Sequence, residues 1–156
     1  MLTIMIPGSK KIEAGHLVLD YNGTLAVDGK LIPGVKERLA TLSKQMTIHV
    51  LTADTFGTSP KELSGTNCKL TILRPPFLDE QKKQLITELG KDNVVAIGNG
   101  ANDALMLQSA ALGILVIQEE GASVKALLNA EIVCKSCLDA LDLLKNKLRI
   151  TATLRT

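Results

Sequence analysis

Two polar segments of this chain contain residue types that handle phosphate groups and divalent metal ions. In the first, Asp20 follows the apolar run at 16–19 and precedes Tyr21-Asn22-Gly23-Thr24. A carboxylate exposed at the end of a strand can act as a nucleophile toward phosphorus. Gly23 permits a tight turn in which backbone amides face an anion. The segment also fits a plain hairpin turn, because Asn-Gly is a strong two-residue turn signal.

The second segment, Gly98-Asn99-Gly100-Ala101-Asn102-Asp103, follows the aliphatic run at 94–97. Its side-chain oxygens suit Mg²⁺, which takes few protein ligands and keeps several waters. The alternative is a dinucleotide-binding fingerprint, but Asp103 stands where the third glycine of that pattern is needed. No phosphate-binding P-loop pattern occurs in the chain. We therefore regard this segment as a candidate metal-binding loop.

Thr52 and Lys82 are two further candidates for contacts with phosphate. Thr52 follows the apolar run at 48–51, and its hydroxyl and backbone amide could hold a phosphoryl oxygen. Lys82 begins a helical pattern and could neutralise the charge on both a carboxylate and a phosphate. Each residue alone says little, because threonine is ordinary at a strand end and most lysines on helices are solvated.

The residues between these segments predict the elements that must position them. Aliphatic runs alternate with helical patterns, which is typical of a three-layer, doubly wound α/β fold with a mainly parallel sheet. Strands are expected at 16–19, 46–51, 70–73, 94–97, 114–117 and 132–133; helices are expected at 35–44, 79–89, 102–110, 123–128 and 138–144, with a short helix capped by Ser59. The loops that follow such strands lie at one edge of the sheet, where Asp20, Thr52 and the loop at 98–100 should converge.

A length of 156 residues fits one domain. We divide it into an N-terminal β segment (1–14), a catalytic core (15–145) and a C-terminal tail (146–156). The apolar stretch at 2–6 is expected to add a strand to the main sheet. Its alternative role is a contact with a second copy of the chain in a homo-oligomer.

The composition excludes several classes of protein. With 18 basic and 16 acidic residues and no basic block, the chain shows no signature of binding nucleic acid or an anionic membrane. No apolar run is long enough to span a bilayer, and a cytoplasmic location is the default. The three cysteines form no disulfide framework. Cys134 and Cys137 are too few ligands for a tetrahedral zinc site, which leaves a redox motif as their alternative role.

Taken together and in this order, the four candidate segments resemble the motifs of the haloacid dehalogenase superfamily over roughly residues 15–135. They are most similar to the subgroup called soluble P-type ATPases. Residues 20–25 resemble the first motif, 51–54 the second, Lys82 the third, and 95–103 the hinge motif of the ATPases, with Asn99 in place of its first aspartate. The resemblance implies a Mg²⁺-dependent phosphatase or phosphotransferase that forms an aspartyl-phosphate on Asp20.

The resemblance also implies a role for each matched residue. Asp20, Asn22, Thr52 and Lys82 would be the catalytic residues; Gly23, Thr52, Ala53 and Lys82 would bind phosphate; and Asp20, the backbone carbonyl of Asn22, Asn99 and Asp103 would hold Mg²⁺. Whether Asp103 is a direct ligand or a support behind the ligands stays open. No insertion large enough for a cap domain interrupts the motifs, so the expected site is open to a phosphorylated small molecule or a phosphoprotein.

Two residues depart from the pattern of the superfamily. Hydrolytic members carry a second aspartate two residues after the nucleophile, and this chain has Asn22 there. General acid–base catalysis contributes about 10²–10⁴-fold, so we expect slow hydrolysis and a long-lived phosphoenzyme. Asn99 lacks the charge of a carboxylate, so Mg²⁺ should bind more weakly. The alternative function is a phosphate-binding or regulatory protein that has kept the fold and lost turnover.

Overall fold

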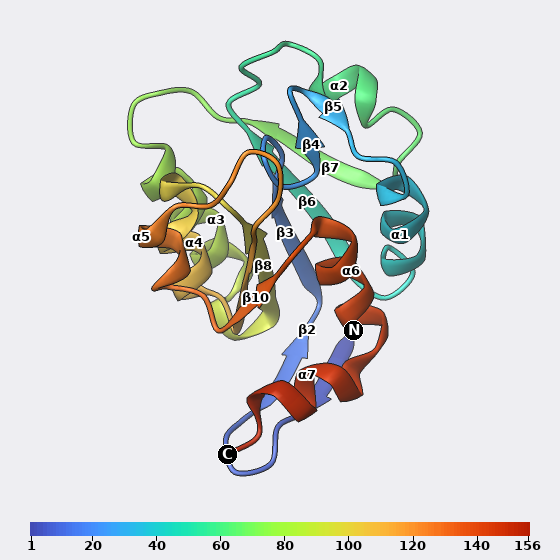
Figure 1. The fold of residues 1–156 in the computed structure, drawn as a ribbon, viewed down its shortest axis with the longest axis vertical. Helices are drawn as coiled ribbons and strands as arrows, with labels where there is room; N and C mark the ends of the chain where they lie inside the picture. The colour runs from blue at the N-terminus through green and yellow to red at the C-terminus, as the bar shows by residue number, and fades with distance from the viewer.

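The computed structural model describes all residues from 1 to 156. The centre of the molecule is a six-stranded sheet (Figure 1). All neighbouring strands are parallel, in the order β10-β9-β8-β3-β6-β7. The strands are β3 (His16–Asp20), β6 (Thr47–Thr52), β7 (Cys68–Ile72), β8 (Val94–Gly98), β9 (Leu112–Val116) and β10 (Ile132–Cys134). Each predicted strand is present, and the doubly wound α/β fold is confirmed.

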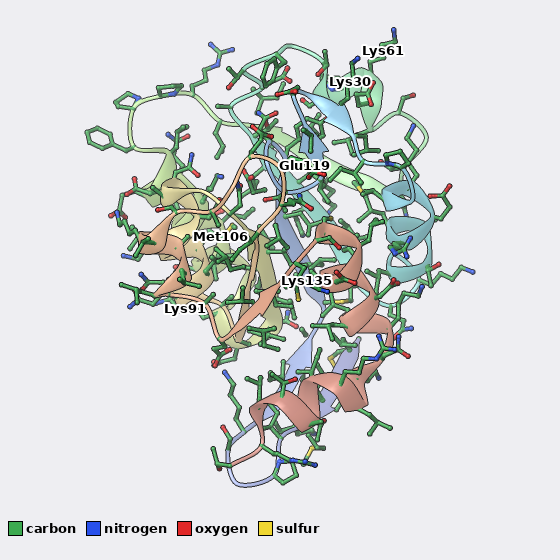
Figure 2. The ribbon with its side chains drawn as sticks, viewed as in Figure 1. Lys30, Lys61, Lys91, Met106, Glu119 and Lys135 are labelled. Carbon is green, nitrogen blue, oxygen red and sulfur yellow. The ribbon has the colours of Figure 1, made fainter.

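Helices cover both faces of this sheet. One face is covered by α1 (Val35–Leu42) and α6 (Cys137–Lys145), and the other by α3 (Leu78–Leu89), α4 (Ala104–Ser109) and α5 (Val124–Leu127). Successive side chains of a strand point to opposite faces, so a strand buried on both sides must be apolar throughout. In β3, Leu17 and Leu19 pack with the first core and Val18 with the second. Met106 on α4, labelled in Figure 2, is fully buried in the second core.

The order of the strands decides where the polar loops lie. β3 is central and pairs with β6 on one side and β8 on the other. In register, Leu19 stands opposite both Val50 and Ile97, so the three strands end at the same level. The carboxyl ends of parallel strands therefore bring the residues after β3, β6 and β8 to one edge, as the sequence predicts.

The N-terminal segment does not extend the main sheet, so the expectation of an extra strand there is wrong. β1 (Leu2–Met5) and β2 (Lys11–Ala14) pair antiparallel as a separate two-stranded sheet. Residues 146–156, expected to be a tail, contain the helix α7 (Lys147–Leu154), which packs against β1 at the bottom of the view in Figure 1. The buried side chains of the hairpin and Ile150 of α7 belong to the first core. The hairpin thus buries its apolar side against its own chain's last helix.

Only small elements separate the motifs. β4 (Ala26–Val27) and β5 (Lys30–Leu31) form a hairpin, with positive φ at both Asp28 and Gly29 as a two-residue type I′ turn requires. Between β6 and α3 the chain holds α2 (Ser59–Glu62) and β7. The cap of α2 is Thr58 and not Ser59, an error of one residue. Neither connection holds a cap domain.

No helix of the structure combines the length and the apolar character that a bilayer crossing requires.

Candidate active site

A buried ammonium group joins helix α3 to the end of β3 and to the loop after β8 at the carboxyl edge of the sheet. Lys82, on the second turn of α3, places Nζ 2.8 Å from Asp20 Oδ1, 2.6 Å from Asp103 Oδ1 and 3.1 Å from Asn102 Oδ1. Its side chain is 2% exposed. Burial opposes the charge, but the Asp20 and Asp103 carboxylates outweigh this effect and raise the pKa of Lys82 above its usual range. Three acceptor oxygens therefore surround a charged group that has three protons to donate.

Asp20 ends β3 and is held by one donor on each oxygen. Oδ1 accepts from Lys82, and Oδ2 accepts from the hydroxyl of Thr24 at 3.0 Å. Burial and the nearby Asp103 carboxylate raise the pKa of Asp20 to about 6, against the lowering effect of Lys82. The Asp20 and Asp103 carboxylates share the single Lys82 ammonium, so the cluster of three groups carries one unbalanced negative charge when both carboxyl groups are ionised, which favours binding of a further cation.

Thr24 and Asn99 complete the surroundings of the Asp20 carboxylate. Thr24 Oγ1 lies 3.0 Å from Asp20 Oδ2 and 3.3 Å from Asn99 Oδ1. The hydroxyl has one proton for these two acceptors, so one oxygen is always left without a donor. Asn99 keeps Oδ1 on this side because its Nδ2 donates to the Gly121 carbonyl at 3.0 Å. A carboxylate oxygen beside a neutral amide oxygen is a donor set that fits Mg²⁺.

Asp103 lies behind this group of oxygens. Oδ1 accepts from Lys82, and Oδ2 accepts from the backbone N–H groups of Asn99 at 2.9 Å and Gly100 at 2.8 Å. A Cβ atom at Gly98 would stand 2.6 Å from the Asp103 carboxyl carbon, so only glycine fits there. With both oxygens engaged and no exposed surface, the contacts of Asp103 favour the supporting role over direct metal ligation.

Thr52, at the end of β6, turns its hydroxyl toward the same region. Its Oγ1 accepts from the backbone N–H of Asp54 at 2.8 Å and lies 3.5 Å from Asn22 Nδ2. Both contacts use the oxygen as an acceptor, so the hydroxyl proton is free for another group. Asn22 Oδ1 is buried and has no hydrogen-bond partner.

These side chains line a cavity of about 240 Å³. Its wall is formed by Asp20, Asn22, Thr52, Ala53, Thr55, Leu73, Leu78, Lys82, Asn99, Gly100 and Asn102. Six of the eight residues predicted for the site are in this wall. The other two, Gly23 and Asp103, lie directly behind it: Asp103 binds Lys82, and a Cβ atom at Gly23 would collide with the Asn99 amide.

Gln118 links the turn after Asp20 to the start of α6, and this contact is not visible in the sequence. It follows β9, next to Glu119, which Figure 2 labels in the loop at the carboxyl edge of the sheet. Its Nε2 donates to the backbone carbonyls of Gly23 at 3.0 Å and Thr24 at 2.6 Å. Its Oε1 accepts from the Cys137 N–H at 2.9 Å. A single amide thereby fixes the turn that carries Thr24.

We expect Gln118→Leu to lower the free energy of unfolding by about 1–3 kcal/mol, because it leaves two carbonyls and one N–H without their partner. The measurement is urea denaturation. Gln84→Leu is the matched control: Gln84 is exposed and bonds only Glu88. It should change stability by about 0.5 kcal/mol or less. Equal losses in the two variants would show that Gln118 holds nothing in place.

The C-x-x-C pair does not have the properties of a redox motif. Burial raises the pKa of Cys134 to about 11 and that of Cys137 to about 12. Reactive thiols need a lowered pKa, because the thiolate is the nucleophile. No cluster of three or more histidine, cysteine, aspartate or glutamate side chains that could hold a metal occurs in the structure. The contacts of these cysteines are therefore those of core residues.

Comparison with known sequences finds relatives without an established activity. No family model matches the chain. Uncharacterized protein MJ0073 of Methanocaldococcus jannaschii is 50% identical over 78 residues, which are 47% of this chain and 84% of the relative. Uncharacterized protein MJ0072 of the same organism is 54% identical over 39 residues, 25% of this chain and 89% of the relative.

Comparison with solved structures finds phosphatases of the haloacid dehalogenase (HAD) superfamily. The 3-deoxy-D-manno-octulosonate 8-phosphate phosphatase of Moraxella catarrhalis, in complex with magnesium, phosphate and its sugar, has a TM-score of 0.69 at 10% identity; the match covers 89% of this chain and 90% of that one. The cobalt-bound phosphatase YrbI of Haemophilus influenzae has 0.71 at 11%, covering 92% and 94%. BT1666 of Bacteroides thetaiotaomicron has 0.62 at 13%, covering 96% and 98%. At these identities the likeness shows the fold. The resemblance to soluble P-type ATPases stays a prediction.

Proposed function

We propose that this chain, which belongs to the same family as uncharacterized protein MJ0073 and has the fold of the HAD phosphatases, transfers phosphoryl groups through Asp20. The reaction would be that of a Mg²⁺-dependent phosphatase or phosphotransferase with slow hydrolysis. The observation that carries the proposal is the cavity in which the Asp20 carboxylate, the Lys82 ammonium and the Thr52 hydroxyl meet. The three groups come from β3, α3 and β6 and meet at the carboxyl edge of the sheet.

Asp20, Asn99 and the backbone carbonyl of Asn22 would hold the metal, and Asp103 would keep the Asn99 loop in place. The unbalanced negative charge of the cluster formed by Asp20, Asp103 and Lys82 and the shared Thr24 proton support these metal ligands. Mg²⁺, when bound, would offset the repulsion between the attacking carboxylate and the phosphate. Because Asn99 is neutral, we expect a modest metal affinity.

The chain's own groups would position the two anions. Lys82 holds Asp20 in one orientation through the 2.8 Å contact and adds positive charge beside it. The free Thr52 proton would be donated to a phosphoryl oxygen, with the backbone of Ala53 in the same wall. The backbone of Gly23 is engaged elsewhere, because its N–H donates to the Ala26 carbonyl and its carbonyl accepts from Gln118. Preorganised donors of this kind in a partly desolvated site account for much of the stabilisation of a transition state.

Asn22 would make the second half of the reaction slow. An amide has no useful pKa, so it cannot take a proton from water as the aspartate of hydrolytic relatives does. The aspartyl-phosphate should therefore persist. Because no cap covers the cavity, the phosphoryl donor could be a phosphorylated small molecule or a phosphoprotein.

The test is covalent labelling of the protein. We expect incubation with para-nitrophenyl phosphate or acetyl phosphate to produce an acid-stable, base-labile phosphoprotein, detected by intact-protein mass spectrometry. EDTA should prevent labelling, and added Mg²⁺ should restore it. Absence of labelling, together with calorimetric binding of inorganic phosphate, would favour a phosphate-binding or regulatory protein. The two amides Asn22 and Asn99 are the observation behind that alternative, since they reduce the negative charge that a phosphate meets.

A further inference from the structure

The cavity contains no side chain that could protonate a leaving group. Of its lining residues only Asp20 and Lys82 are ionisable. Asp20 is the attacking group of the proposed function. The Lys82 ammonium has three protons, and Asp20, Asn102 and Asp103 provide three acceptors for them within 3.1 Å. Lys82 is therefore fully engaged in holding the site together.

Acidic residues close to the cavity in sequence are occupied as well. Asp103 accepts three hydrogen bonds and does not line the cavity. Asp54, two residues after Thr52, accepts from the backbone N–H of Ser59 at 3.0 Å and is also absent from the wall. Neither carboxyl group is placed to deliver a proton to an atom inside the cavity.

The group at the position of the missing acid is an acceptor. Asn22 is part of the cavity wall, and its Oδ1 is buried without a hydrogen-bond partner, while its Nδ2 donates to Thr52 Oγ1 at 3.5 Å. A carbonyl oxygen cannot donate a proton to a departing oxygen atom. The cavity thus combines a nucleophile with groups that bind phosphate and lacks a general acid.

This lack limits which phosphoryl donors can react. In the first step an Asp20 oxygen forms a bond to phosphorus, and the bond between phosphorus and the leaving oxygen breaks. The electron pair of that bond departs with the leaving oxygen. An alcohol oxygen, with a very high pKa, must receive a proton as it departs. A carboxylate, a phosphate or an acidic phenolate is stable as the anion and needs none.

We propose, on the basis of the function proposed above, that the phosphoryl donor of this chain is an anhydride of phosphoric acid, either an acyl phosphate or a phosphoanhydride, and not an alkyl phosphate monoester. The products of the first step are then the aspartyl-phosphate and a free carboxylate or phosphate anion. No proton enters or leaves the cavity during this step.

The test compares donors in the first turnover with Mg²⁺ present. The rate of phosphoprotein formation is measured with acetyl phosphate, ATP, a series of substituted phenyl phosphates and glycerol 3-phosphate. We expect the rate to fall steeply as the pKa of the leaving group rises across the phenyl series. Whichever of acetyl phosphate and ATP reacts faster identifies the kind of anhydride.

The variant Asn22→Asp separates the effect of the missing general acid from the intrinsic reactivity of the donors. A carboxyl group at position 22 should accelerate phosphorylation by glycerol 3-phosphate by about 10²–10⁴-fold and leave the rate with acetyl phosphate within about tenfold. Asn102→Asp is the matched control, since it adds the same charge to the cavity wall beside Lys82. It should not change the ratio of the two rates.

The outcomes distinguish this inference from the proposed function. Equal rates with glycerol 3-phosphate and acetyl phosphate in the wild type, or a flat phenyl series, would overturn the anhydride inference alone. An unchanged ratio in a folded Asn22→Asp variant would do the same. Failure of every donor to phosphorylate Asp20 would overturn the proposed function and this inference with it. The phenyl series needs no variant, so the result does not depend on how Asn22→Asp folds.

Discussion

Asp20→Asn should abolish phosphate incorporation and lower the hydrolysis of para-nitrophenyl phosphate by about 10³-fold or more. The amide has the shape of the carboxyl group but is not a nucleophile, and it cannot balance the charge of a metal ion. The fold should survive, because Lys82 keeps its contacts with Asn102 and Asp103. Labelling is followed by mass spectrometry and hydrolysis by the release of para-nitrophenol.

The stability of the Asp20→Asn variant in EDTA gives a second readout with a defined sign. The pKa of Asp20 is raised to about 6 in the folded protein, above the unfolded value, mainly by burial. Its contribution to stability is therefore present below the unfolded pKa and is lost as the pH rises through about 6. The variant does not titrate there, so its stability relative to the wild type should increase between pH 4 and 8.

Asp28→Asn is the matched control for the first prediction. Asp28 is exposed in the turn between β4 and β5, and asparagine tolerates its positive φ. The control should label and hydrolyse as the wild type does. Hydrolysis that survives in Asp20→Asn at the level of Asp28→Asn would assign the activity to another residue and remove the proposed mechanism.

Asn22→Asp should shorten the lifetime of the phosphoenzyme by about 10²–10⁴-fold. The new carboxylate would replace an amide of the cavity wall whose oxygen has no partner, and it could take a proton from the attacking water. The measurement is the decay of labelled protein after a chase with unlabelled donor. In the wild type we expect a burst of para-nitrophenol followed by a slow steady rate; in the variant the burst should disappear as the steady rate rises.

Asn102→Asp again provides the control. It adds a carboxylate to the cavity wall beside Lys82, and not at position 22. Its phosphoenzyme should decay no faster than that of the wild type. If both variants accelerate decay equally, added charge and not the position of a proton acceptor controls the rate. If neither does, residue 22 has no role in hydrolysis.

The layers of the fold could be predicted because the strands are buried on both faces. Runs such as Val94–Gly98 are apolar throughout, and the Asp28-Gly29 turn has a local signature. The helix α7 could not be predicted in this way. Of its residues only Ile150 is buried, while Leu148 is 82% exposed, so no apolar stripe marks it. Its position depends on the hairpin at the other end of the chain.

Some residues of the candidate site could also be predicted from the sequence, and others could not. Residues at strand ends, such as Asp20 and Thr52, could be placed because parallel strands end together. Thr24, Asn102 and Gln118 could not, because their roles come from contacts between loops distant in sequence. The supporting contacts of Asp103 likewise depend on how closely the Asn99 backbone approaches it. Such approaches are set by packing and leave no local pattern.

The hairpin and α7 place both chain ends at the amino side of the sheet, since β2 leads directly into β3 and Asp20 ends that strand. Five residues of β3 separate the two levels by roughly 17 Å. A fluorophore, an affinity handle or a sensor surface joined to either end would thus leave the mouth of the cavity facing the solution. The same placement makes α7 a suitable point from which to tether this protein for single-molecule observation of the proposed phosphoenzyme.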